Sequence, residues 1–160
     1  MTVSLNGIAH VYITVQDFAA CRPFYRALLP FLEMECLIDT EVLYYCVGSR
    51  TGVAIRAAAA DHEDTRFDPY RAGLHHLCFR ARSREDVDTI EAFVREQGAL
   101  IVHPAREDDW ASGYYSLLFE DPGGTRLEVN HVPGKGNLDA GVELPLPAER
   151  QRRLSDPEDR

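Results

Sequence analysis

Two segments of the sequence are similar enough to be copies of one structural unit. Residues 7–15 read GIAHVYITV and residues 72–81 read AGLHHLCFRA, and superposing the two places His76 on His10. The separation of these histidines along the sequence is typical of one supersecondary unit that is repeated in a chain. The chain is therefore predicted to contain two copies of the unit, each opening with a strand that carries a histidine.

The first copy predicts a strand, a helix and three further strands. Residues 5–15 are rich in β-branched and aromatic side chains and alternate in polarity, which indicates a strand with an apolar and a polar face. The polar face carries His10, Tyr12 and Thr14. Asp17 can cap a helix that runs to about residue 29. Strands are expected at about 32–38, 41–47 and 52–59.

The second copy repeats this order. A strand is expected at 73–82, followed by a helix that begins at Ser83, where Ser83 and Asp86 form a capping box, and ends at Gly98. Strands are expected at about 99–103, 113–120 and 125–131, and the turn at 121–124, DPGG, joins the last two. Alternation along the last strand puts Glu128 on the face that it shares with Asn130.

The pattern predicts an α+β fold built from two βαβββ modules. We expect one domain at 1–133, with modules at about 5–60 and 72–132, and a tail at 134–160. A four-stranded sheet with one covered face and one polar, open face suggests that the two open faces meet in a cleft, with the helices outside. A chain of 160 residues is long enough to hold its own core.

Composition excludes several classes of partner and location. No apolar run is long enough to span a membrane, and the first ten residues lack the basic and apolar regions of a secretory signal, so a cytoplasmic protein is expected. The net charge is −9, and no run of Lys and Arg lies beside aromatic residues. Nucleic acid is therefore not an expected partner.

Four segments together carry a family resemblance: IAHV at 8–11, FYRALL at 24–29, GLHHLCF at 73–79 and FEDPGGTRLEV at 119–129. Over residues 5–133 the chain resembles the vicinal oxygen chelate superfamily, which contains glyoxalase I, extradiol dioxygenases, fosfomycin-inactivating thiol transferases and bleomycin-binding proteins. The resemblance implies the glyoxalase/dioxygenase-like fold and a homodimer.

The resemblance also implies a divalent metal ion held by His10, His76 and Glu128. Two imidazoles and one carboxylate suit Fe, Mn, Zn, Ni or Co, and leave positions open for a small oxygenated substrate. The alternative for either histidine alone is a structural role. Alternation along the strand at 73–82 predicts that His75 points to the face opposite His76. His62, His103 and His131 are not expected to be ligands, because of their loop positions or wrong parity.

The chain departs from glyoxalase I at the fourth metal ligand, a glutamate on the last strand of the first module. The alignment puts Arg56 there, within one residue, and an arginine cannot ligate. Arg56 is a candidate for binding an anionic group of the substrate, although a surface role remains open.

Dioxygenases and thiol transferases of the family carry a tyrosine ten residues before the glutamate, where this chain has Leu118. Tyr114 and Ser116 share the face of Leu118 and can supply the hydroxyl instead. We therefore expect Glu128 and Tyr114 to be catalytic. The expected substrate-binding residues are Arg56, Tyr12, Ser116, Leu118 and Asn130.

These observations predict a metal-dependent dioxygenase, or a lyase or isomerase, that acts on a small molecule. Three alternatives stay open. The chain resembles metal-free sequestering proteins of the bleomycin-resistance type as well as fosfomycin-type thiol transferases, and a vestigial metal site in a regulatory protein is the third possibility.

Overall fold

The computed structural model describes residues 2–62 and 65–134 and contains two modules of a strand, a helix and three strands, which confirms the predicted fold class. The first module consists of β1 (His10–Val15), α1 (Phe18–Phe31), β2 (Glu35–Asp39), β3 (Leu43–Gly48) and β4 (Thr51–Ala57). A 3-10 helix, η1 (Ala60–His62), follows it. The second module consists of β5 (Leu77–Arg80), α2 (Arg84–Glu96), β6 (Leu100–Asp108), β7 (Tyr114–Glu120) and β8 (Arg126–His131).

Each module folds into one four-stranded sheet with the same strand order. The orders are β1-β4-β3-β2 and β5-β8-β7-β6, so the last strand of each module lies beside the first. These two pairs, β1 with β4 and β5 with β8, are parallel, and the other neighbours are antiparallel. β1 and β5 are therefore equivalent edge strands; His10 is the first residue of β1, and His76 directly precedes β5.

The helix boundaries follow from the expected caps. The Asp17 side chain accepts a hydrogen bond from the backbone N–H of Ala20 at the start of α1. Ser83 and Asp86 form the predicted capping box at the start of α2. Two strands are shorter than expected: β1 begins at His10, and β5 begins at Leu77. Gly73, with φ of 147°, changes the chain direction shortly before β5.

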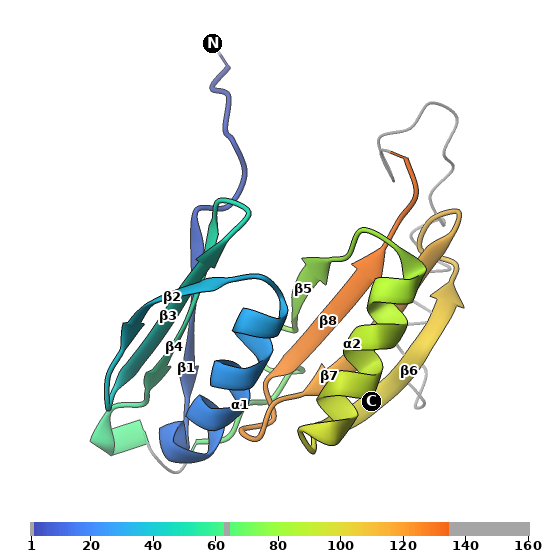
Figure 1. Ribbon diagram of the computed structural model, residues 1–160. Coiled ribbons are helices and arrows are strands. Elements are labelled where there is room, and N and C mark those ends of the chain that lie inside the picture. Colours follow the sequence, from blue (N-terminus) through green and yellow to red (C-terminus); the bar gives the residue numbers. More distant parts are fainter. Residues whose placement is uncertain (1, 63–64, 135–160) are drawn as a thin grey trace.

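The two modules are joined through their helices. The ring of Phe31 on α1 stacks on Phe93 of α2, with the ring centroids 3.9 Å apart. The hydroxyl of Tyr25 on α1 donates a hydrogen bond of 2.8 Å to Asp121 in the β7–β8 turn. The buried apolar residues of both modules form one continuous cluster, and Figure 1 shows α1 between its own sheet and the second module.

This packing corrects one detail of the expected arrangement. Both sheets turn their helix-covered faces toward the shared core, so in the described residues of one chain the two open faces do not meet in a cleft. Each helix packs on its own sheet, and the stacked rings of Phe31 and Phe93 extend the apolar core from one module to the other. The open faces lie away from this shared core: His10 is exposed on the first, whereas Glu128 is buried on the second.

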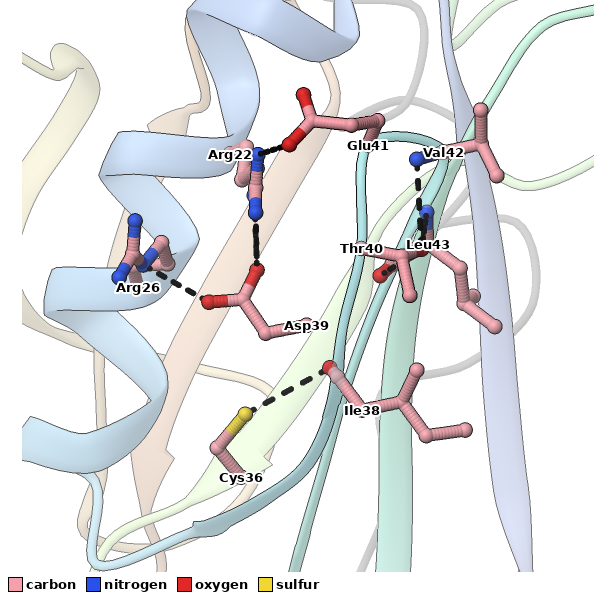
Figure 2. A network of polar contacts seen from close by, with 9 residues as sticks. All are labelled: Arg22, Arg26, Cys36, Ile38, Asp39, Thr40, Glu41, Val42 and Leu43. Atoms are coloured by element: carbon pink, nitrogen blue, oxygen red, sulfur yellow. Dashed lines mark hydrogen bonds and ion pairs between the residues drawn. The ribbon is translucent and has the colours of Figure 1, made fainter.

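Ion pairs hold the edge strand of the first sheet to its helix. Arg22 on α1 lies 2.7 Å from Asp39 and 3.2 Å from Glu41, and Arg26 lies 3.2 Å from Asp39 (Figure 2). The side chains of β2 itself are all exposed. The pairs therefore fix the end of an edge strand that has few buried contacts of its own.

Two further expectations concern membranes and the tail. No helix within residues 2–62 and 65–134 is long and apolar enough to cross a membrane. The predicted tail at 134–160 lies, beyond Gly134, outside the described residues.

Candidate active site

The second module brings a histidine, a glutamate and a tyrosine into direct contact. Nε2 of His76 lies 2.8 Å from Oε2 of Glu128, and the hydroxyl of Tyr114 donates a hydrogen bond of 2.5 Å to Oε1 of the same carboxylate. The Glu128 residue is only 7% exposed. Both carboxylate oxygens therefore have a partner, as a largely buried carboxylate requires.

Strand register explains why these side chains meet. Glu128 on β8 lies opposite Cys78 of β5 and Leu118 of β7, and Asn130 lies opposite Ser116. Leu127 and Val129 on the other face of β8 are buried in the core, so alternation turns Glu128 and Asn130 to the open face. The expected group Tyr114, Ser116, Leu118, Glu128 and Asn130 thus lies on one sheet face, with His76 at its edge.

The partners of Glu128 set its charge. Burial alone would raise its pKa, but the hydrogen bonds from His76 and Tyr114, together with the nearby His76 and His103, lower the pKa below the ordinary value. The carboxylate is therefore ionised at neutral pH. Burial and the hydrogen bond to Glu128 raise the pKa of Tyr114, so its hydroxyl keeps its proton and acts as a donor.

His75 lies next to His76 rather than on the opposite face, so the prediction from strand alternation was wrong. β5 begins only at Leu77, and alternation does not apply to the irregular backbone before it. Nδ1 of His75 lies 2.7 Å from Nδ1 of His76. Burial, and then the nearby His76 and Arg126, lower the pKa of His75.

Several polar side chains near Glu128 were not among the predicted site residues. Cys78 is its neighbour on β5, and burial and the adjacent Glu128 charge raise the pKa of the Cys78 thiol. His103 lies on β6 opposite Leu118, close enough to lower the pKa of Glu128. Arg126 is buried, pairs with Glu120 at 3.3 Å and lies over the ring of Tyr70. Strand pairing, which one sequence alone does not give, is the signal that finds them.

The open face of the first sheet carries the other half of the predicted site. The rings of His10 and Tyr12 are 5.5 Å apart, edge to face, and Tyr12 lies 6.2 Å from Tyr45 on β3 at an interplanar angle of 20°. A Cβ atom at Gly52, which pairs with His10, would lie 2.3 Å from the Tyr45 hydroxyl. The absence of a side chain at Gly52 therefore lets the Tyr45 ring lie on the sheet beside His10.

The strand registers also correct the position assigned to Arg56. If His10 matches His76, then Tyr12 matches Cys78, whose partner on β8 is Glu128. The partner of Tyr12 on β4 is Ala54, while Arg56 pairs with Thr14 one row further along. Ala54, and not Arg56, thus occupies the first-module position equivalent to Glu128. Arg56 is exposed on the open face and remains a candidate for anion binding.

The geometry fits two ligands of one metal ion within a chain. Two ligand atoms, each about 2.1 Å from an ion, lie roughly 3 Å apart at a right angle, close to the 2.8 Å between His76 and Glu128. In the described part of the chain, however, no group of three His, Cys, Asp or Glu side chains could hold an ion. His10 is therefore not brought to His76 and Glu128.

A groove between the modules reaches this cluster only at Cys78, the strand neighbour of Glu128. Its volume is about 660 Å³, and its walls include Phe31 and Met34 of the first module and Phe79, Arg80 and Ile90 of the second. His10, His76, Tyr114 and Glu128 do not line it. The candidate site thus lies on an open sheet face of the chain.

Comparison with known proteins agrees with the fold. The family model for the Glyoxalase/Bleomycin resistance protein/Dioxygenase superfamily matches residues 7–129. No curated protein matches the chain significantly. Among solved structures, similar chains include a candidate glyoxalase from Bacillus halodurans (26% identity, 79% of this chain and 96% of that chain, TM-score 0.68).

Two further structures show the same similarity. A glyoxylase/bleomycin resistance protein/dioxygenase domain from Frankia sp. EAN1pec is 26% identical over 80% of this chain and 98% of its own, with a TM-score of 0.64. A lactoylglutathione lyase from Agrobacterium tumefaciens is 21% identical over 79% and 94%, with a TM-score of 0.57, and supports the fold alone. With two matching modules and a family model that covers most of the sequence, the chain belongs to the Glyoxalase/Bleomycin resistance protein/Dioxygenase superfamily.

Proposed function

We propose that the protein is a divalent-metal-dependent enzyme that acts on a small oxygenated molecule, by dioxygenase or lyase/isomerase chemistry. The observation that carries the proposal is the contact of His76 and Tyr114 with the two oxygens of a buried, ionised Glu128. An imidazole nitrogen and a carboxylate at ligand spacing, beside a protonated hydroxyl, are what metal-assisted proton transfer requires.

The metal ligands in this proposal are His76 and Glu128 of one chain and His10 of a second copy. Among the described residues of one chain only two ligands come together, while His10 lies on the exposed face of the other sheet. Pairing that face with the Glu128 face of another copy would bury both and supply the third ligand. A homodimer with two sites follows from the symmetry of such an exchange.

The remaining side chains have separable roles. A bound divalent ion supplies a Lewis acid that polarises substrate oxygens. Tyr114 donates a proton or hydrogen bond beside Glu128, and Asn130 contacts Tyr114 from the same face. Ser116 and Leu118 form the floor on β7, while Tyr12 and Arg56 contact the substrate from the first sheet. Ala54 supplies no second carboxylate base, which disfavours strict glyoxalase I chemistry.

A metal-free binding protein is the second candidate. It is favoured by the lack of a three-ligand group in the described residues of one chain. In that case the same open faces would enclose a ligand through Tyr12, Arg56 and Tyr114 without an ion. The two candidates differ in one measurable property, the metal content of the protein.

Elemental analysis of protein purified without chelator or added metal tests the proposal. We expect close to one equivalent of a divalent metal per chain, and a rise in melting temperature when Zn, Mn, Ni, Co or Fe(II) is added to stripped protein. His76→Ala should abolish binding, and His62→Ala, an exposed histidine on η1, should leave it unchanged. Less than about a tenth of an equivalent without any thermal shift would leave the metal-free binder as the better account.

A further inference from the structure

Two of the four cysteines lie directly opposite each other on neighbouring strands. Cys36 on β2 pairs with Cys46 on β3 in antiparallel register. Side chains at directly opposed positions of antiparallel strands share a face, with Cβ atoms about 4.5–5.5 Å apart. The other two cysteines have different surroundings: Cys21 lies on α1, and Cys78 is opposite Glu128. Within the described residues, strand register therefore brings together one pair of thiols.

A β-bulge sets the direction of the Cys36 side chain. The register shifts between Cys36 and Ile38, so Leu37 is an extra residue on β2. Without the bulge, alternation would turn Cys36 and Asp39 to opposite faces. With it, both belong to the face covered by α1, where Asp39 reaches two arginines of that helix. The buried Cys46 lies on the same face, so the bulge turns Cys36 toward it.

The two thiols differ in their access to solvent. Cys36 is exposed at the edge of the sheet, whereas Cys46 is fully buried. Sγ of Cys36 makes a weak 3.6 Å hydrogen bond to the carbonyl oxygen of Ile38 (Figure 2), which a rotation about the Cα–Cβ bond breaks easily. Burial raises the pKa of the Cys46 thiol, and the neighbouring Cys36 raises it further. Cys36 is therefore the thiol that meets a reagent from solution first.

We propose that Cys36 and Cys46 are a redox modification site, at which a small-molecule disulfide such as oxidised glutathione converts the two thiols into a cross-strand disulfide. Cys36, as the thiolate, attacks one sulfur of the oxidant and releases the first glutathione. Cys46 then loses its proton and attacks the Cys36 sulfur of the mixed disulfide, which releases the second glutathione. Two protein thiols are oxidised, one glutathione disulfide is reduced to two thiols, and the two thiol protons pass to the glutathione.

The bond fits the edge of the first sheet. A disulfide needs Cβ atoms roughly 3.5–4.5 Å apart, which is the short end of the separation between directly opposed positions. A small approach of β2 to β3 provides it, and β2 is an edge strand whose side chains are all exposed. The disulfide would add a covalent link to the ion pairs through which Asp39 holds β2 to α1. This role does not depend on the proposed metal chemistry.

Redox titration of the folded full chain, followed by peptide mapping, tests the proposal. The protein is equilibrated with mixtures of reduced and oxidised glutathione, and the remaining thiols are trapped by alkylation. A protease that cuts after glutamate then separates the two cysteines at Glu41. In the oxidising mixtures, the peptides that carry Cys36 and Cys46 should be joined, and excess reduced glutathione should separate them. Cys21 and Cys78 should remain in unjoined peptides.

Two variants show whether the pair itself is responsible. Cys36→Ser removes the exposed thiol and should give no joined peptides. Cys78→Ser keeps the pair, and should form the disulfide over the same range of glutathione ratios as wild type. The proposal would be overturned if wild-type Cys36 stayed a free thiol or stopped at the mixed disulfide with glutathione. Joining that occurred only in urea-unfolded protein would also overturn it, because the strand register would then have no part in the reaction.

Discussion

Tyr114 shows how much of the site depends on a single hydroxyl. Its hydrogen bond to Glu128 serves a carboxylate that is 7% exposed, and bonds to charged groups contribute about 1.5–3 kcal/mol to stability. Tyr114→Phe should therefore lower the free energy of unfolding of the metal-free protein by about 1–2 kcal/mol, measured by urea denaturation.

The neighbouring Tyr115 is a matched control for this change. Its hydroxyl also donates to a carboxylate, Asp88, at 2.7 Å, but that bond is exposed to solvent. Tyr115→Phe should cost less than about 1 kcal/mol. Equal losses of unfolding free energy in the two variants would show that the burial of Glu128 does not strengthen its hydrogen bond with Tyr114.

For single residues, the sequence predicts which side chains belong to the site better than it predicts which side chains contact each other. The repeat and the strand parity bring Tyr114, Glu128 and His76 to one face, and the structure joins them. His75 was misplaced because alternation was extended beyond the start of β5. Arg56 was assigned one row away from its true position, because one sequence does not reveal that Tyr12 pairs with Ala54.

At the scale of elements, the β7–β8 turn is fastened to α1 by a buried hydrogen bond. Tyr25 donates to Oδ2 of Asp121, while Oδ1 accepts from the backbone N–H groups of Gly123 and Thr125. The turn belongs to the second module and the helix to the first. The DPGG sequence therefore predicts the turn correctly, but it does not predict that Asp121 of this turn binds α1 of the other module.

Tyr25→Phe should weaken this link in a pH-dependent way. Burial raises the pKa of Asp121 despite the hydrogen bonds that lower it, so the folded state favours the protonated carboxyl. The contribution of Asp121 to the free energy of unfolding is fully present below its pKa in the unfolded state. It is lost as the pH rises through its pKa in the folded state. Without the Tyr25 bond the folded pKa rises further. The variant should lose about 2 kcal/mol near pH 7 and less near pH 4, measured by urea unfolding.

A loss of the same size at both pH values would contradict this account of Asp121. Phe24→Leu, on the same buried stretch of α1, is a useful control, because it changes packing next to Tyr25 without removing a hydrogen bond to Asp121. Its cost should vary little between the two pH values.

The elements themselves were largely predictable, whereas their assembly was not. Capping residues, turns and periodicity locate both helices and all eight described strands, because these signals are local. The boundaries are less accurate: β1 and β5 begin later than expected, and β6 ends at Asp108 instead of about 103. How the two modules pack on each other depends on which surfaces bury more apolar area at their contact, those of the helices or the open faces of the sheets. The stacked Phe31 and Phe93 show that α1 and α2 touch within the chain. The apolar stripe of the second helix predicts that Phe93 is packed, but not that its partner is Phe31 of the other module.

For the whole molecule, the orientation of the two sheets decides whether a complete metal site needs one copy of the chain or two. His10 on the first sheet and His76 with Glu128 on the second cannot reach one ion within the described residues of one chain. In an exchanged dimer, each site takes His10 from one copy and His76 from the other. In a site built within one chain, both histidines come from the same copy.

Mixing variants separates these arrangements. When His10→Ala and His76→Ala are unfolded together in equal amounts and refolded, half of the dimers should contain one chain of each kind, and an exchanged dimer of that kind has one intact site. Metal content should then rise from near zero in each variant alone to about a quarter of the wild-type value. The matched control mixes wild type with the double variant: exchange predicts about a quarter of the wild-type metal, and sites within one chain predict about half. No recovery in the first mixture, with half in the second, would place both histidines of a site in one chain.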